Sequence, residues 1–181
     1  MTYQDDDPYA PKKTAGPTLV KSWLIAGTAD MAGAMIWNYF YRDTPPLNIL
    51  TYIGRTVLGK DRAGERALEQ IGWNEWYEWY MRFEGLIFHY SIAFGWTYLF
   101  YALWPRLKFM QENKIVTAAI YGAFIWIVMN LAIVPLRTGK WIQNPDWINI
   151  GVNVLILALA FGVTLSFMIG GYYEKRNLEA K

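Results

Sequence analysis

The chain has 181 residues, with 17 Lys and Arg, 15 Asp and Glu, one His and no Cys. Four stretches, at residues 23–41, 85–104, 115–136 and 148–172, total 86 residues and contain only one charged side chain, Asp30. This distribution excludes a soluble globular enzyme, a nucleic-acid-binding module and a disordered protein, and the absence of Cys excludes disulfides and thiolate sites.

Each of the four stretches is 19 to 25 residues long, which is enough for a helix to cross a hydrocarbon core of about 30 Å. Helices are the default spanning form, because lipid cannot satisfy unpaired backbone N–H and C=O groups. We therefore predict an all-α polytopic membrane protein with a four-helix transmembrane bundle. Its membrane domain covers residues 18–173, between polar tails at 1–17 and 174–181.

The segments before and between the first two spans carry further signals. Residues 1–17 lack the apolar core and cleavage site of a signal peptide, so we expect the first span to be retained. Apolar residues recur at three- and four-residue spacing over residues 47–58. Over residues 70–83, aromatic side chains follow one helical face and charged side chains another. The sequence predicts amphipathic interfacial helices at both places.

The later links are short, which favours antiparallel neighbours in an up-down bundle. With four spans both termini share a side, and that side carries nine Lys and Arg residues. The opposite side carries four near the ends of spans, once the middle of the long first loop is discounted. We therefore expect both termini in the cytoplasm.

Asp30 and His89 are the ionisable residues within the predicted spans. An ionised carboxylate at that depth costs several kcal/mol, so Asp30 is either a proton- or cation-binding group or a packing carboxyl bonded to a neighbouring helix. His89 is the only histidine, and three roles remain open for it: a hydrogen bond inside the bundle, a proton-linked role, or ligation of haem or a chlorophyll-type pigment.

Asn130 and Asn153 complete the polar set within the spans. Each is a candidate for ordinary interhelical hydrogen bonding, and together with Asp30 and His89 they also suggest a polar interior track. The sequence contains no Gly-rich phosphate loop, no His-Glu-x-x-His and no nucleophile elbow. We therefore expect no catalytic residue, no metal site and no enzymatic activity.

Several short motifs resemble those of a known family. They are Leu24–Asp30, Leu86–Trp96, Val128–Leu131 and Val134–Leu136, together with the pair Tyr121-Gly122. Over about residues 20–170 the chain resembles the YagU-like family of small, largely uncharacterised four-span bacterial inner-membrane proteins, which has a loose link to acid tolerance. The resemblance implies a multi-pass protein of the bacterial inner membrane. It also implies that Asp30, His89, Asn130 and Pro135 occupy recurring positions of the family.

Three functional hypotheses follow. The first is a non-catalytic accessory or structural subunit of a larger membrane complex, which contacts lipids and other membrane subunits and needs neither a cofactor nor nucleic acid. The second is a small proton-linked transporter or acid-response membrane protein that uses Asp30 and His89. The third is a subunit that ligates haem or a chlorophyll-type pigment through His89.

Overall fold

The computed structural model of the chain describes residues 15–58, 74–139 and 141–179, and every regular element in these ranges is a helix. The predicted all-α class is therefore confirmed. Two of the long helices contain a stretch of π-helix, labelled η. The elements are α1 (Ala15–Arg42), α2 (Asn48–Leu58), α4 (Asn74–Leu103), α5 (Lys108–Glu112), α6 (Lys114–Val128), η1 (Met129–Ile133), α7 (Val134–Thr138), α8 (Trp147–Leu157), η2 (Ala158–Val163) and α9 (Thr164–Glu179).

Three segments of the described chain are helical, long and apolar enough to cross a membrane: Glu75–Leu103, Lys114–Thr138 and Trp147–Arg176. They correspond to the second, third and fourth spans predicted from the sequence, and their length and composition are consistent with a membrane protein. The helix α1 is comparable in length, at 28 residues, but it is less apolar because it contains Lys21, Asp30 and a run of Ala and Gly.

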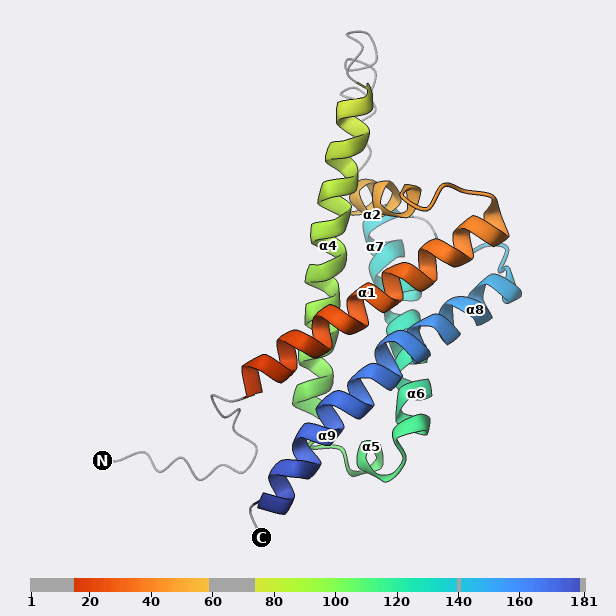
Figure 1. The fold of residues 1–181 in the computed structure, drawn as a ribbon. Coiled ribbons are helices and arrows are strands. Elements are labelled where there is room, and N and C mark those ends of the chain that lie inside the picture. The colour runs from red at the N-terminus through yellow and green to blue at the C-terminus, as the bar shows by residue number, and fades with distance from the viewer. Residues whose placement is uncertain (1–14, 59–73, 140, 180–181) are drawn as a thin grey trace.

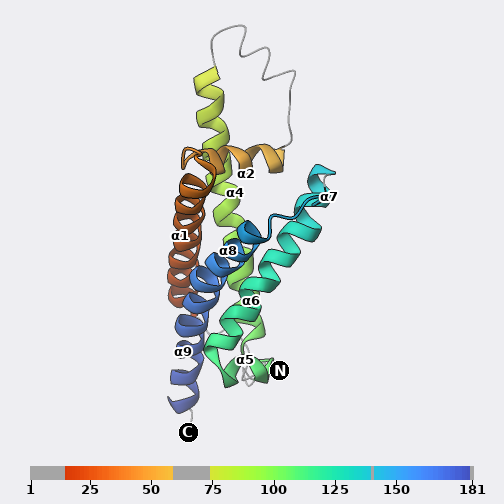
Figure 2. The same cartoon turned by 90° about the vertical axis from the view of Figure 1, so that its right-hand side faces the viewer.

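The long helices run alternately up and down (Figures 1 and 2). The start of α1, the last turns of α4, the short helix α5 and the end of α9 lie together, and we call this the α5 end. At the opposite end lie α2, α7 and the start of α8, and we call this the α2 end. The helix α2 lies across the bundle rather than along it (Figure 1).

The segment between the first two spans differs in part from the sequence expectation. A separate helix is present at Asn48–Leu58, where one was predicted at 47–58. No separate helix covers the described part of 70–83: residues 74–83 form the first turns of the continuous helix α4, and residues 70–73 lie outside the described ranges. The continuity has a plain reason, because nothing between Asn74 and Leu103 is a proline, and the two glycines, Gly85 and Gly95, are tolerated within a helix.

The helix α2 is packed directly on the backbone of α4. A side chain at Gly54 would collide with the carbonyl group of Met81, and a side chain at Gly85 would collide with the carbonyl group of Leu50. Because the two glycines lie on facing helices, the two backbones approach more closely than any larger residue would permit. This contact fixes α2 against the first third of α4.

A second close contact of the same kind joins α6 to η2. A side chain at Gly122 would meet the backbone of Ala158, and one at Gly162 would meet the backbone of Ala118. Each helix therefore presents two small residues four positions apart, Ala118 with Gly122 and Ala158 with Gly162, to its antiparallel partner. Small residues at this spacing are a common way for membrane helices to pack closely without a hydrophobic driving force.

The tightly packed core lies toward the α5 end. Trp104, from the turn that follows α4, packs on Phe100 and against Gly170 of α9. Toward the α2 end, α7 diverges from α4 (Figure 2). The bundle is thus closed at one end and splayed at the other. The buried apolar cluster consists of Ala15, Ala26, Ala93, Phe100, Tyr101, Trp104, Met110, Tyr121, Ile125, Phe161, Leu165, Ile169 and Tyr173.

Candidate functional site

His89 joins two helices. Its Nε2 atom lies 2.9 Å from the backbone oxygen of Gly27, which connects α4 to α1. A carbonyl oxygen can only accept, so Nε2 carries the proton and donates this bond. The close approach is possible because Gly27 has no side chain: a Cβ there would press on Ala93 and the ring of Tyr90. Of the three roles left open by the sequence, this geometry provides the interhelical hydrogen bond.

Asn130 stands in the π-helical stretch η1, just before Pro135. Pro135 has no N–H to give to the helix, and the backbone N–H of Val134 instead bonds to the carbonyl of Met129, five residues back. The side-chain amide of Asn130 donates to the carbonyl of Trp126 at 3.0 Å. This bond lies within the helix of Asn130 itself, in a turn whose regular backbone bonding is altered.

Asn153 belongs to a small amide cluster that ties α8 to α1. Its Nδ2 donates to the backbone oxygen of Asn149 at 2.7 Å and to the side-chain oxygen of the same residue at 2.9 Å. That side-chain oxygen also accepts from the indole Nε1 of Trp37 at 2.8 Å. The polar group of Asn153 thus holds Asn149 in the orientation that receives Trp37.

Asp30 is half-buried on the face of α1 that meets the other helices. It lies four residues after the fully buried Ala26 and three before Gly33, whose missing side chain makes room for Ile156 of α8. It is also one turn from Gly27, the acceptor of the His89 bond. In the described parts of the chain, no hydrogen bond joins the side chains of Asp30 and His89.

The four polar candidates therefore occupy three separate places. Asp30 and His89 lie near each other at the seam between α1 and α4, while Asn153 is in the amide cluster of α8. Asn130 lines a cavity at the α2 end. No group of three or more His, Asp or Glu residues among the described residues could hold a metal ion.

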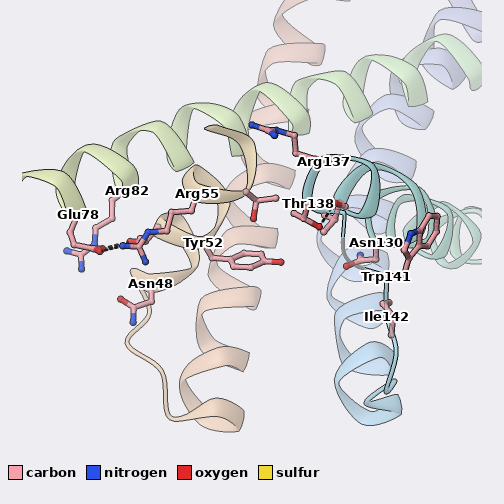
Figure 3. Close-up of a pocket in the computed structure, with 13 residues that line it drawn as sticks. Asn48, Tyr52, Arg55, Glu78, Arg82, Asn130, Arg137, Thr138, Trp141 and Ile142 are labelled. Atoms are coloured by element: carbon pink, nitrogen blue, oxygen red, sulfur yellow. Dashed lines mark hydrogen bonds and ion pairs between the residues drawn. The ribbon is translucent and has the colours of Figure 1, made fainter. Parts of the chain in front are cut away.

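The cavity at the α2 end has a volume of about 930 Å³ and lies between α2, α4 and α7 (Figure 3). We call it the arginine cleft, because three of its lining residues are Arg55, Arg82 and Arg137 and only one, Glu78, is acidic. The remaining lining residues are Asn48, Thr51, Tyr52, Thr56, Asn130, Val134, Thr138, Trp141 and Ile142.

Two of the arginines of the arginine cleft connect helices. Arg55 of α2 forms an ion pair with Glu78 of α4, with 2.5 Å between Nη2 and Oε1, and the hydroxyl of Thr51 donates to the other carboxylate oxygen at 3.2 Å. Arg137 of α7 donates from Nε to the carbonyl of Val57 at 2.9 Å. That carbonyl lies in the last turn of α2, where helical acceptors lack partners within the helix. Arg137 therefore links the diverging α7 to α2.

Arg82 is held differently. Its guanidinium carbon lies 4.9 Å from the centre of the Trp79 ring, a cation–π contact on the same helix. Its Nε is shielded from solvent and has no hydrogen-bond partner within the described structure. Figure 3 shows Arg82 beside Glu78 and Arg55 on one wall of the cleft, with Asn130 and Thr138 on the other.

The arginine cleft was not predicted from the sequence. The sequence indicated only that charged side chains follow one helical face over residues 70–83. The signal that was present is the four-residue spacing of Glu78 and Arg82, which puts both on one face of α4. The position of α2 across that face, and the approach of α7, come only from the tertiary structure.

Outside the spans, Asp146 joins α1 to α8 at the α2 end. Its side chain caps α8 by accepting from the backbone N–H of Asn149 at 3.1 Å, and its other oxygen accepts from the hydroxyl of Tyr41 at 2.9 Å. The bond from Asn149, followed by that from Tyr41, holds the pKa of the Asp146 carboxyl below its usual value.

No family model, curated protein or solved structure matches the chain in comparisons with known proteins.

Proposed function

We propose that the protein is a non-catalytic, four-span membrane protein that serves as a structural or accessory subunit of a larger membrane assembly. The observation that carries the proposal is the use of its intramembrane polar groups. His89 bonds to a backbone carbonyl across helices, and Asn130 and Asn153 bond to carbonyls in their own helices. The His89 bond joins two helices and the two Asn bonds stay within single helices, and these separate bonds support packing rather than a relay for ions or protons.

The outer faces of the long helices support a role among lipids and other subunits. Large apolar side chains are exposed along them, for example Ile120, Leu155 and Phe167, each at least half exposed. Such a surface would be a liability in water, and it is the surface that lipid tails or neighbouring membrane helices cover. The partners that we propose are therefore membrane lipids and further membrane-protein subunits.

We include α1 as the fourth span. Its 28 residues measure about 42 Å along the axis, which exceeds the thickness of the hydrocarbon core. It crosses α4 and runs alongside α8 and α9 (Figure 1), and its exposed Val20, Leu24 and Ile25 are suited to lipid. Its start and the end of α9 are at the same end of the bundle, as four spans require.

The remaining parts of the proposal rest on the sequence. The excess of Lys and Arg beside the termini supports a cytoplasmic location for both of them. The motifs around Asp30, His89 and Asn130 support membership of the YagU-like family and a place in the bacterial inner membrane.

Ligation of haem or a pigment is the least supported of the three hypotheses. The Nε2 atom of His89 donates to Gly27, so Nδ1 is the only ring nitrogen left that could bind a metal. The surrounding small residues are used for helix contact instead, since Gly27 lies against Tyr90 and Ala93.

A proton-linked function remains the second candidate, and Asp30 is the observation that favours it. Its carboxyl group lies on the inward face of α1, next to the turn that receives His89. An intramembrane acid of this kind is a functional candidate by default. The conservative change Asp30→Asn separates the two functions, because it keeps the size and polarity of the side chain but removes its titration.

The deciding experiment is mild solubilisation of the native membrane, followed by native gel electrophoresis and mass spectrometry. The subunit proposal expects stoichiometric membrane partners to remain bound to this chain. Isolation of a small oligomer of the chain alone would contradict it. In parallel, Asp30→Asn should keep its abundance and assembly and should change no proton flux in reconstituted vesicles. If the native protein carries a proton flux that Asp30→Asn loses, the result would favour the proton-linked function over the subunit proposal.

A further inference from the structure

We propose that the arginine cleft binds the phosphate group of an anionic membrane lipid. This inference rests on the membrane location of the chain and not on its role as a subunit. Four observations support it: the charge of the cleft, its position relative to the spans, its apolar wall, and the Nε atom of Arg82, which has no hydrogen-bond partner among the described groups.

The cleft carries a surplus of positive charge. Three guanidinium groups face one carboxylate, that of Glu78, which forms an ion pair with Arg55. Arg82 and Arg137 therefore bring positive charge that no acidic side chain of the cleft offsets. Arginine is the side chain best suited to phosphate, because its planar fork can donate two parallel hydrogen bonds to the oxygens.

The cleft lies at the level where lipid headgroups are found. Glu78 and Arg82 stand in the first two turns of the candidate span Glu75–Leu103, and Thr138 is the last residue of Lys114–Thr138. The cleft is therefore at the ends of two spans, beside the helix α2 that lies across the bundle (Figure 1). Basic pockets between membrane helices bind acidic lipid headgroups by charge, and phosphate offers the same charge on either side of the membrane.

The opposite wall supplies the apolar part of a lipid site. Val134, Trp141 and Ile142 line the cleft together with Tyr52, whose ring projects from α2 toward Trp141 (Figure 3). An inorganic phosphate ion has no apolar surface that could pack on this wall, whereas the glycerol and upper acyl chain of a lipid would pack on it. A volume of about 930 Å³ is also larger than an inorganic phosphate needs.

Arg82 provides an independent indication of a ligand. Its Nε is shielded from solvent and has no hydrogen-bond partner among the described groups, which is a costly state for a donor of a charged side chain. Arg82 lines the cleft, so a small rotation of its guanidinium would turn this donor toward an acceptor oxygen there. The cation–π contact with Trp79 keeps the guanidinium at the wall, so little side-chain entropy would be lost on binding.

The test uses the full-length protein, purified and delipidated in a neutral detergent, with binding measured by native mass spectrometry and by lipid-dependent thermal stabilisation. The probes are phosphatidylglycerol, phosphatidylcholine of the same chain length, and inorganic phosphate. We expect phosphatidylglycerol to bind at least about tenfold more tightly than phosphatidylcholine, and phosphate to compete poorly. Equal binding of the two lipids would overturn the proposal. Competition by phosphate as strong as by phosphatidylglycerol would overturn the assignment to a lipid.

The variants Arg82→Gln and Arg137→Gln are expected to weaken binding of phosphatidylglycerol by about tenfold each. Arg42→Gln is the matched control: it removes the same charge from an exposed position at the α2 end that does not line the cleft. It should bind as the native protein does. Arg137 also bonds to the carbonyl of Val57, so the melting temperature of each variant without lipid is measured to check its fold. If Arg137→Gln is destabilised, Arg82→Gln alone decides the outcome. Unchanged binding by Arg82→Gln would contradict the proposal.

Discussion

Gly122 of α6 and Ala158 of η2 meet backbone to backbone, and a side chain at position 122 would collide with the nitrogen, Cα and Cβ of Ala158. The contact is repeated one turn away, where Gly162 faces the carbonyl of Ala118. Because α6 and η2 run in opposite directions, the small residues of one helix fit against those of the other. This relationship sets the distance between the third and fourth long helices.

The first prediction tests that contact. Gly122→Ala should destabilise the protein by about 1–3 kcal/mol, because the added methyl group has no space and the helices must separate. The matched control is Gly95→Ala in α4, where nothing lies within 4 Å of the added carbon. The control should be neutral or slightly stabilising, by up to about 1 kcal/mol, through its better helix propensity. Thermal unfolding in detergent measures both, and equal effects of the two changes would contradict the packing described.

The second prediction concerns the hydrogen bond between His89 and Gly27. His89→Gln retains a donor of similar reach and should keep most of the stability. His89→Leu removes the donor and should cost about 0.5–1.5 kcal/mol. Unfolding in detergent gives the difference. An equal loss in both variants would show that the imidazole ring acts by a property other than its hydrogen bond, such as ligation or titration.

The third prediction concerns pH. The pKa of Asp146 is held below its usual value of about 3.9 by Asn149 and Tyr41, so its carboxylate stabilises the fold at any pH above that usual value. The stabilisation should be lost as the pH falls below about 4 and through the lowered pKa. Melting temperatures measured from about pH 6 down to about pH 3 should therefore drop less steeply for Asp146→Asn than for the native protein.

Tyr41→Phe gives the intermediate case, because it removes the second of the two bonds and leaves the one from Asn149. Its acid-induced drop in melting temperature should fall between those of the native protein and Asp146→Asn. If the native protein and Asp146→Asn lose stability identically over this range, the capping bond does not contribute as described.

The fourth prediction tests the spans. The chain has no Cys, so each introduced Cys gives an unambiguous signal. In intact cells a membrane-impermeant thiol reagent should label Pro46→Cys and Gln143→Cys. It should leave Lys13→Cys, Lys108→Cys and Lys175→Cys unlabelled until the membrane is opened. Labelling of Lys13 and Pro46 from the same side would show that α1 does not cross the membrane, and outside labelling of Lys108 would reverse the orientation.

The sequence by itself determined the helical class and the position of the long apolar segments. A run of about twenty uncharged residues has few ways to satisfy its backbone in lipid, so length and charge are enough to place a span such as 115–136. The same reasoning anticipated a helix close to Asn48–Leu58. The change in polarity near residue 84 led to the prediction of a separate helix at 70–83, before the span. The backbone of α4 instead continues through that change.

The tertiary structure alone decided how these helices meet. The interhelical bond of His89 depends on the atom opposite it, and only the packing of α4 on α1 put the carbonyl of Gly27 there. The arginine cleft gathers Arg55, Arg82 and Arg137 from three helices that are remote in sequence. Such a grouping is set by crossing angles and by contacts between small residues, as at Gly85 and Leu50. Periodicity within one helix carries no information about those contacts, because it fixes which residues share a face and not what that face meets.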